Sequence, residues 1–238
     1  MSDNLFKFNQ MAAHSKRVVV VDCDEVLVNI SPKAVKLMHE DFDYYNRFFR
    51  LSKDFDLEKQ TPIILNRPEY YINKWLLRKD VLDNYTIKEY EEAEARFTDN
   101  FNRDDYYEDL IPTNLGLTLS KLLRTHVIEK LIVVSKVVDI NRTGSKERFL
   151  KKLFRNSTNK LSVYFVESGN KKSEIVNLVN NDKLAQVYED EVSNIEDIIN
   201  NANKTDFELM IPSLGYNDTI SDQSLITAKE KGILIKYY

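Results

Sequence analysis

The stretch that decides the fold is VVVVDCDEVLVN, residues 18–29. Four consecutive valines lead into two aspartates, Asp22 and Asp24, and apolar residues resume after Glu25. An apolar run without polar alternation is typical of a strand that is buried on both faces, as the central strands of parallel sheets are. We therefore expect a central strand with two acids at its carboxyl end.

Strand-length apolar runs recur along the chain, at 130–135, 161–167, 185–190 and 207–212, and the run at 232–238 is a candidate edge strand. Between the later runs, apolar residues recur at helical spacing, around 149–154, 175–179 and 195–202. Strands that alternate with helices indicate a parallel sheet. The prediction is an α/β fold, with a Rossmann-like parallel sheet and helices on both of its faces.

Residues 30–112 interrupt this alternation. They are rich in Tyr, Phe and charged residues, and contain helical patterns near 32–51, 68–80 and 86–102. Ser31 and Pro32 suit a helix start, with Ser31 as the N-cap and Pro32 at the first helical position. We predict a core formed by residues 1–29 and 113–238, and an all-helical cap formed by residues 30–112.

Composition narrows the class of protein. Of the 238 residues, 42% are hydrophobic and 30% are charged, which is enough apolar material for a real core. The formal net charge of −4 argues against a non-specific nucleic-acid binder. The single cysteine, Cys23, fits a reducing cytoplasm, and we expect no signal peptide and no membrane span.

Polar residues stand at the ends of four predicted strands: Asp22 and Asp24, Ser135, Glu167, and Glu189 with Asp190. Ligands of open parallel sheets bind at the carboxyl ends of the strands. Carboxylates are ligands for Mg²⁺, whereas a hydroxyl, a lysine and helix N-terminal amides bind phosphate oxygens. Taken singly, each residue is more simply a strand end or a solvated helix start. Taken together, they predict phosphate chemistry.

In their order along the chain, these residues resemble the four motifs of the haloacid dehalogenase-like phosphohydrolases. Asp22-Cys23-Asp24-Glu25-Val26 matches the first motif, a hydrophobic strand followed by Asp-x-Asp-x-(Thr/Val), and Ser135 in LIVVSK matches the second. The third is a lysine at a helix start, supplied in GNKKSEIV by Lys172 or, less favoured, by Lys171.

The fourth motif is where the sequence departs from the family. The usual Asp-Asp pair is replaced by Glu189-Asp190-Glu191. Asp190 is the main candidate metal ligand, and Glu189 and Glu191 compete for the supporting position. A displaced carboxylate at this point would weaken Mg²⁺ binding.

The resemblance implies a mechanism. Asp22 attacks phosphorus and becomes an aspartyl phosphate, while Asp24 protonates the leaving oxygen and then activates water. Phosphoryl oxygens are bound by Ser135 and Lys172. The metal is held by Asp22, the backbone carbonyl of Asp24, and Asp190, with Glu189 in support.

The cap and the second aspartate indicate the substrate class. The resemblance implies hydrolysis of small phosphorylated metabolites, because a helical cap of this size excludes macromolecules. The segment YYEDLIPTNLGLTLSKLLR, residues 106–124, resembles the return segment of nucleotidase-type phosphatases, so nucleoside 5′-monophosphates are one candidate class. Two alternatives stay open: a polynucleotide-end phosphatase, and a catalytically silent protein that binds a partner through its aromatic cap.

Overall fold

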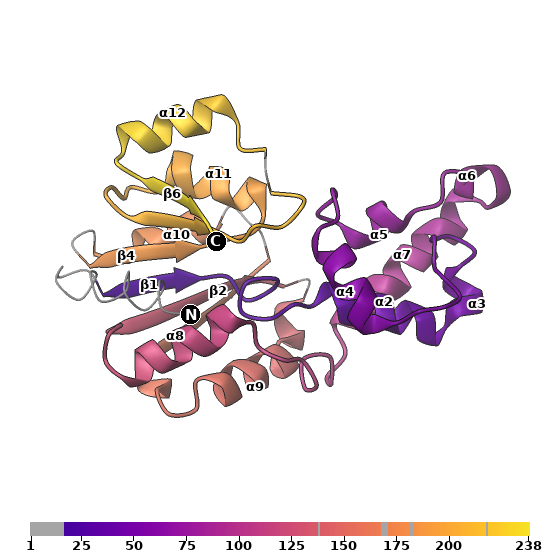
Figure 1. Cartoon of the computed structure of the whole chain (residues 1–238), viewed down its shortest axis with the longest axis horizontal. Helices are drawn as coiled ribbons and strands as arrows, with labels where there is room; N and C mark the ends of the chain where they lie inside the picture. The colour runs from indigo at the N-terminus through magenta and orange to yellow at the C-terminus, as the bar shows by residue number, and fades with distance from the viewer. Residues whose placement is uncertain (1–16, 138, 168–170, 181–182, 218) are drawn as a thin grey trace.

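The valine run forms β1 (Val18–Val21), which lies in the middle of a six-stranded sheet (Figure 1). The structure is a computed structural model that describes residues 17–137, 139–167, 171–180, 183–217 and 219–238, without the side chains of Asn141 and Lys171. The first 16 residues of the predicted core lie outside these ranges. In the described part of the chain, no helix combines the length and apolarity that crossing a bilayer requires.

All five strand pairings are parallel, and the strand order is β3-β2-β1-β4-β5-β6. The remaining strands are β2 (Lys130–Lys136), β3 (Leu161–Val166), β4 (Leu184–Tyr188), β5 (Glu208–Ile211) and β6 (Leu234–Tyr237). The predicted Rossmann-like parallel sheet is therefore confirmed, including the edge strand at the C-terminus.

Alternate valines of β1 face opposite sides of the sheet. Val19 and Val21 belong to one apolar cluster and Val18 and Val20 to another, and none of the four is more than 6% exposed. One face is covered by α8 (Asn114–Arg124) and α9 (Gly144–Leu153), the other by α10 (Lys171–Asn177), α11 (Val192–Asn201) and α12 (Asp222–Glu230). Burial of each valine stabilises the fold by about 1.5 kcal/mol or more, so the uninterrupted run follows from a strand with two buried faces. Two short 3₁₀ helices, η1 (Ile140–Arg142) and η2 (Thr158–Lys160), complete the core.

Tyr106 and Tyr107 pack in the apolar cluster of the sheet, but the helices between residues 31 and 101 form a helical body beside the carboxyl ends of the strands (Figure 1). Its helices are α2 (Ser31–Glu40), α3 (Phe42–Tyr45), α4 (Leu57–Leu65), α5 (Ile72–Leu76), α6 (Val81–Asn84) and α7 (Ile87–Phe101). The body has an aromatic core of its own, in which Tyr45, Phe48 and Phe49 are almost fully buried. We refer to it as the cap.

The cap helices differ from the sequence pattern in three places. The helix expected over 32–51 breaks at Asp41, whose backbone leaves the helical region. The helix expected over 68–80 shortens to α5. Helix α4 was not expected, because Pro62 lies inside it and a proline has no N–H for the helix ladder.

The proposed N-cap at Ser31 is wrong. Helix α2 begins at Ser31 itself, Ile30 occupies the N-cap position, and no side chain of the cap residue bonds the helix start. The Glu25 carboxylate accepts a hydrogen bond from the Ser31 backbone N–H at 2.8 Å instead. A residue next to the catalytic candidates therefore does the capping, and Ser31 does not.

The two connections between core and cap lie side by side. Val28 and Pro112 form an antiparallel bridge, and the Thr113 backbone N–H donates to the carbonyl of Leu27 at 2.9 Å. The Thr113 hydroxyl donates to the carbonyl of Val26 at 2.7 Å. The cap is thus joined to the core within a few residues of the Asp22-x-Asp24 sequence.

Candidate active site

A tight turn follows β1 and holds the first two acids. Leu27 and Val28 both donate backbone hydrogen bonds to the carbonyl of Cys23, and Glu25 has a φ of 55°. A left-handed backbone at a residue other than glycine costs about 1 kcal/mol, and such strain is concentrated at functional sites. The turn leaves Asp22 buried at the strand end and Asp24 partly open, with 21% of its side chain exposed.

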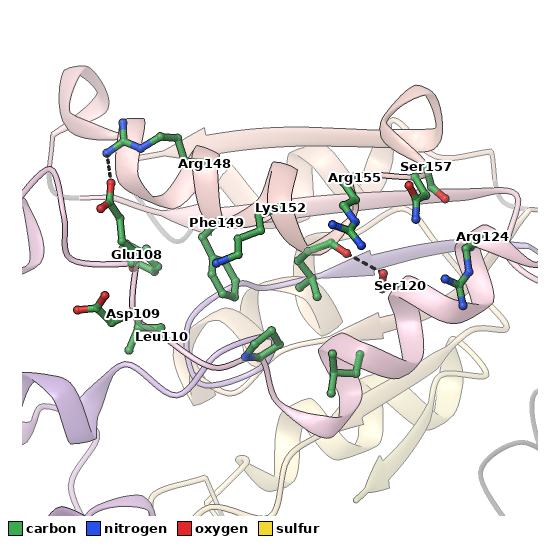
Figure 2. A pocket seen from close by; sticks show the side chains of 15 residues that line it. Glu108, Asp109, Leu110, Ser120, Arg124, Arg148, Phe149, Lys152, Arg155 and Ser157 are labelled. Carbon is green, nitrogen blue, oxygen red and sulfur yellow. Dashed lines mark hydrogen bonds and ion pairs between the residues drawn. The ribbon is translucent and has the colours of Figure 1, made fainter.

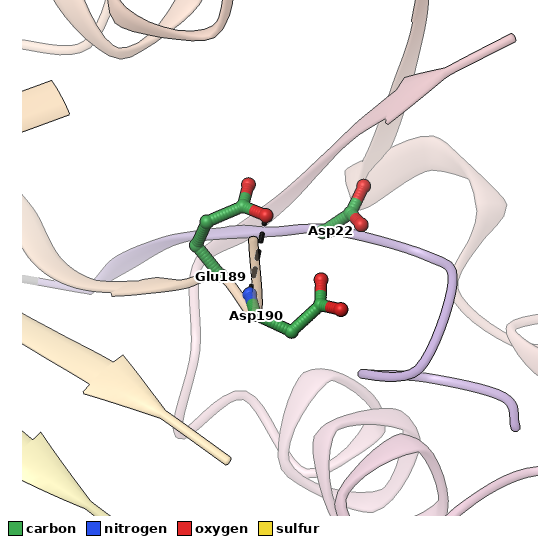
Figure 3. A group of neighbouring side chains, drawn as sticks. All are labelled: Asp22, Glu189 and Asp190. Atoms are coloured by element: carbon green, nitrogen blue, oxygen red, sulfur yellow. Dashed lines mark hydrogen bonds between the residues drawn. The ribbon is translucent and has the colours of Figure 1, made fainter. Parts of the chain in front are cut away.

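Three carboxylates meet at the carboxyl ends of β1 and β4. Asp22, Glu189 and Asp190 each offer one oxygen within 4.8 Å of the others (Figure 3), and all three side chains are buried. Strands β1 and β4 are neighbours in the sheet, so acids that directly follow each strand meet at one edge. The structure thus brings together three of the carboxylates predicted from sequence.

Lys172 lies against this group. Its Nζ donates to Glu189 Oε2 at 2.6 Å and is 3.1 Å from Asp22 Oδ1. Burial lowers the pKa of Lys172, but the charges of Asp22 and Glu189 outweigh burial and hold it above its ordinary value, so the group is an ammonium. The side chain of the alternative, Lys171, lies outside the described part of the structure.

Glu189 is fully occupied by these and neighbouring contacts. Its Oε1 accepts hydrogen bonds from the backbone N–H groups of Asp190 and Glu191, at 3.1 Å each, and from the Asn194 amide. Because Glu is one methylene longer than Asp, it reaches Lys172 from the end of β4. Its contacts are those of a residue that anchors a lysine, although it lies near enough to assist at a metal.

Glu191 turns away from the acids. Its oxygens accept from the Ser193 hydroxyl and the Asn194 amide, each at 2.9 Å, at the start of α11. Glu167 is exposed at the end of β3 and is also outside the group. Of the two candidates for the supporting position, only Glu189 lies beside Asp190.

A second buried lysine, which the sequence analysis did not single out, lies on the other side of the turn. Lys146, near the start of α9, donates to Asp24 Oδ2 at 2.8 Å and to Ser135 Oγ at 2.9 Å. The other oxygen of Asp24, Oδ1, accepts from the Tyr107 hydroxyl at 2.8 Å. Ser135 and Asp24 are therefore joined through Lys146.

Three buried side-chain oxygens lack a hydrogen-bond partner within the described ranges: Asp22 Oδ1 and Asp190 Oδ1 at the edge of the sheet, and Glu25 Oε2 in the turn after β1. The Lys172–Asp22 contact is an ion pair that is not aligned as a hydrogen bond. Burial raises the pKa of Asp22 to about 7, against the partial opposition of Lys172, and raises the pKa of Asp190 well above its ordinary range. Buried carboxyl groups with raised pKa values are either protonated or paired with a positive charge, and a cation bound beside them would favour their ionised forms.

A divalent cation fits this arrangement. Asp22, Asp24, Glu189 and Asp190 carry four negative charges when ionised, whereas Lys146 and Lys172 supply two positive charges. Two negative charges remain, and the unpartnered oxygens belong to carboxylates, which are the hard ligands Mg²⁺ prefers. The donor set of Asp22 and Asp190 is thus suited to Mg²⁺.

The cap covers the acids through the loop between α4 and α5. The Tyr216 hydroxyl donates to Asp190 Oδ2 at 2.7 Å, and the guanidinium of Arg67 lies 4.6 Å from the Tyr216 ring centroid. Arg67 is 2% exposed and donates to the carbonyls of Ile64 and Tyr70. The Tyr70 ring packs edge-on against Tyr216, with ring centroids 5.2 Å apart, and burial, with the charge of Asp190 second, raises the pKa of Tyr70.

Gly215 permits this closure. A Cβ atom at Gly215 would lie 2.2 Å from the carbonyl oxygen of Asn66. Such a distance is far inside van der Waals contact, so the cap loop reaches the core only because the residue is glycine. The acids therefore lie in a closed site.

A groove of about 750 Å³ lies on the far side of Tyr107, between α8, α9 and residues 107–112 (Figure 2). Its lining includes Tyr107, whose hydroxyl reaches Asp24 in the acid site. Acidic and basic side chains share the groove: Glu108, Asp109, Arg124, Arg148, Lys152 and Arg155. Tyr107 therefore belongs both to the lining of the groove and to the acid site.

Lys146, Tyr107, Tyr216 and Tyr70 were not found from the sequence, and Arg67 was one of several basic cap residues with no means of choosing among them. One signal was present for Lys146, since it starts the helix after the strand that ends in Ser135. The sequence offers Arg47, Arg67, Lys74 or Arg78 as cap residues that could meet a second anionic group; of these, Arg47 pairs locally with Glu89 and Arg78 with Asp80.

No family model and no curated protein matches the chain. Among solved structures, it is similar to a HAD-superfamily hydrolase of subfamily IA, variant 1, from Geobacter sulfurreducens. The identity is 16%, the TM-score is 0.50, and the match covers 83% of this chain and 88% of that one. The fold is that of the haloacid dehalogenase-like hydrolases.

Two further structures are more distant. One is a haloacid dehalogenase-like hydrolase from Burkholderia xenovorans, at 10% identity and a TM-score of 0.45, with 94% of this chain and 95% of that one covered. The other is a hydrolase of the same kind from Xanthomonas campestris, at 8% identity and a TM-score of 0.47, with 88% and 87% covered.

Proposed function

We propose that this chain is a Mg²⁺-dependent phosphatase of small phosphate monoesters that works through an aspartyl phosphate on Asp22. The observation that carries the proposal is the pair of unpartnered, buried oxygens on Asp22 and Asp190, beside a lysine ammonium, at the carboxyl edge of a HAD-like sheet. A cation-binding pair next to a phosphate-binding lysine is what phosphoryl transfer needs.

The residues divide the work by position. Asp22 is the nucleophile, because its carboxylate ends the central strand. Lys172 neutralises charge beside it and Ser135 binds a phosphoryl oxygen, with Lys146 close by. Asp24 exchanges the proton with the leaving oxygen and then with water. Mg²⁺, held by Asp22 and Asp190 with the carbonyl of Asp24, would offset the repulsion between carboxylate and phosphate.

The closed cap supports a small substrate. The acids of the site are buried under a cap loop in which Arg67 and Tyr70 pack toward Tyr216. Closure of this loop would exclude water during transfer and would favour a small substrate over a polymer. Nucleoside 5′-monophosphates are the first class to test, because aromatic side chains and an arginine cover the site and could meet a base or a second anionic group.

Phosphate release tests the proposal. A panel of nucleoside monophosphates and sugar phosphates is incubated with Mg²⁺, with EDTA, and with the Asp22→Asn variant. Asp83→Asn, which changes an exposed cap residue, is the matched control. We expect release that needs Mg²⁺, is lost in Asp22→Asn and is kept in Asp83→Asn.

Two other results would redirect the proposal. Release from 5′- or 3′-phosphorylated oligonucleotides, and from no small ester, would favour a polynucleotide-end phosphatase. No release from any substrate, together with no binding of Mg²⁺ at millimolar concentration, would favour a silent binding protein.

A further inference from the structure

Lys146 is the most completely bonded charged side chain beside the acid site. It is 5% exposed, and its ammonium has three acceptors: Asp24 Oδ2 at 2.8 Å, Ser135 Oγ at 2.9 Å and the carbonyl of Lys136 at 3.3 Å. An ammonium has three N–H donors, so each acceptor can take one. A lysine buried and satisfied in this way has one defined position.

Tyr107 holds the same aspartate from the opposite side. Its hydroxyl donates to Asp24 Oδ1, and its ring centroid lies 5.1 Å from the Lys146 ammonium. Its backbone N–H donates to the Ser145 hydroxyl at 2.8 Å. Ser145 and Lys146 are consecutive residues at the start of α9, so one helix start fixes both groups that hold Asp24.

Each carboxylate oxygen of Asp24 therefore accepts a hydrogen bond, Oδ2 from Lys146 and Oδ1 from Tyr107. In the proposed reaction, the bond from phosphorus to the ester oxygen breaks as the bond to Asp22 forms, and Asp24 passes a proton to the departing oxygen. An Asp24 oxygen must face the departing oxygen for this transfer, which requires hydrogen-bond reach. The proton that is passed on is carried by one Asp24 oxygen, which is then a donor and a poor acceptor, so the present donor to that oxygen, Lys146 or Tyr107, has to leave it.

Lys146 has an alternative partner close by. Because it donates to Ser135 Oγ, the hydroxyl hydrogen of Ser135 is left to bind a phosphoryl oxygen. A phosphoryl oxygen bound there lies next to the Lys146 ammonium, which can then exchange Asp24 Oδ2 for phosphate. Lys172 pairs with Asp22 and Glu189 instead, so Lys146 is the lysine whose position bears on Asp24.

We propose that Lys146 is a positioning residue that frees Asp24 only when phosphate occupies the Ser135 side of the site, with Tyr107 holding the aspartate in place meanwhile. The proposal rests on the proposed phosphatase function and deepens it. It predicts two effects of Lys146: a higher affinity for phosphate, and a higher rate on substrates whose leaving oxygen needs a proton.

The test compares two substrates in four variants. p-Nitrophenyl phosphate releases a stable phenolate that needs little protonation, whereas an alkyl phosphate monoester from the active panel releases an alkoxide that needs it. The variants are Lys146→Met, Lys146→Arg, Tyr107→Phe and, as the matched control, Lys152→Met, an exposed lysine of the same helix. Inorganic phosphate binding in Mg²⁺ is measured calorimetrically on each.

For Lys146→Met we expect kcat/KM on the alkyl ester to fall about 100-fold and kcat/KM on p-nitrophenyl phosphate no more than about 10-fold, since proton transfer to the leaving oxygen supplies the difference. The comparison uses kcat/KM because both substrates share the later hydrolysis of the aspartyl phosphate. The affinity for inorganic phosphate falls about 10-fold with the loss of a charged hydrogen bond. Lys146→Arg keeps the charge and restores part of both. Lys152→Met matches the wild type.

Tyr107→Phe removes one hydroxyl and keeps the ring, so it folds even if Lys146→Met does not. We expect it to slow the alkyl ester about 10-fold, the aryl ester less, and to leave KM unchanged, because only the aspartate loses a partner worth about 1 kcal/mol.

Equal slowing of the two substrates in Lys146→Met, with unchanged phosphate affinity, would overturn the proposal and make the lysine structural. So would an unchanged ratio of the two substrates in Tyr107→Phe if Lys146→Met does not fold. A wild type that neither releases nor binds phosphate would instead remove the proposed function, and the role of Lys146 with it.

Discussion

The uptake of Mg²⁺ should release protons and strengthen as the pH rises through 7. Burial raises the pKa of Asp22 to about 7 in the cation-free protein, and a metal ligand must be ionised. At pH 6 about a tenth of the Asp22 side chains are ionised, whereas at pH 8 about nine tenths are, so the apparent affinity should be about tenfold weaker at pH 6. The pKa of Asp190 is raised as well, which can only steepen the dependence.

The raised pKa of Asp22 also makes stability depend on pH, in the opposite direction: Mg²⁺ affinity rises with pH, whereas the stability of the cation-free protein falls. The folded pKa of Asp22 is above its ordinary value of 3.8, so between these values the folded chain holds a proton that the unfolded chain gives up. Stability of the cation-free protein therefore falls as the pH rises from about 4 to 7 and levels off above that. Over this pH interval the free energy of unfolding falls by at most about 4 kcal/mol, at about 1.4 kcal/mol for each pH unit. Saturating Mg²⁺ should remove the decline.

Isothermal titration with Mg²⁺ at pH 6, 7 and 8, in two buffers of different ionisation enthalpy, measures the affinity and the protons released. Asp190→Asn should bind far less Mg²⁺ at every pH, and Asp83→Asn should match the wild type. An affinity that does not change between pH 6 and 8, or binding without proton release at pH 6, would refute the account of the buried carboxylates.

Three further predictions concern stability, each measured by urea unfolding. Glu189→Gln should lower the free energy of unfolding by about 3 kcal/mol, because it leaves the buried Lys172 without its closest charge partner. Glu191→Gln, the matched control, should lower it by less than about 1 kcal/mol. Equal losses in the two variants would be inconsistent with the contacts described. Tyr216→Phe should cost about 1 kcal/mol and leave the cap docked, since only one hydrogen bond to a carboxylate is lost. Gly215→Ala should destabilise the chain by about 1–3 kcal/mol by pushing the cap loop outward, whereas Gly144→Ala, which meets only a flexible arginine end, should be nearly neutral; a harmless Gly215→Ala would show that the loop does not press on the core.

The core could be predicted from the sequence because its patterns are local. A run such as 18–21 reports burial on both faces, and the acids that follow it must lie at the carboxyl edge of a parallel sheet. The juxtaposition of Asp22 with Asp190 follows from adjacent strands, even though the residues are 168 positions apart in a chain whose β1 pairs with β4. This inference followed from the parallel strand order alone and did not require the positions of any side chains.

What the sequence missed depends on contacts between distant segments. Lys146 reaches Asp24 across 122 positions and Tyr107 reaches it across 83. Apart from the place of Lys146 in the first turn of the helix after β2, nothing in the local sequence distinguishes these side chains from neighbouring lysines and tyrosines. The cap helices were harder for another reason. Pro62 lies inside α4, and a proline within a segment argues against a helix there. The aromatic residues of the cap pack on one another in a compact cluster, which leaves no simple helical periodicity in the sequence.

Because the cap's two connections lie side by side, the cap helices could be replaced as one unit. Entry and exit meet at the bridge between Val28 and Pro112, so to the sheet the whole cap is a single excursion that starts and ends at one point. A cassette of a different size, grafted at the same point, would leave every strand, its register and its neighbours untouched. The cap helices could therefore be exchanged while Asp22 and Asp24 stay in place, provided that Tyr107, which lies inside the excursion and bonds Asp24, is kept.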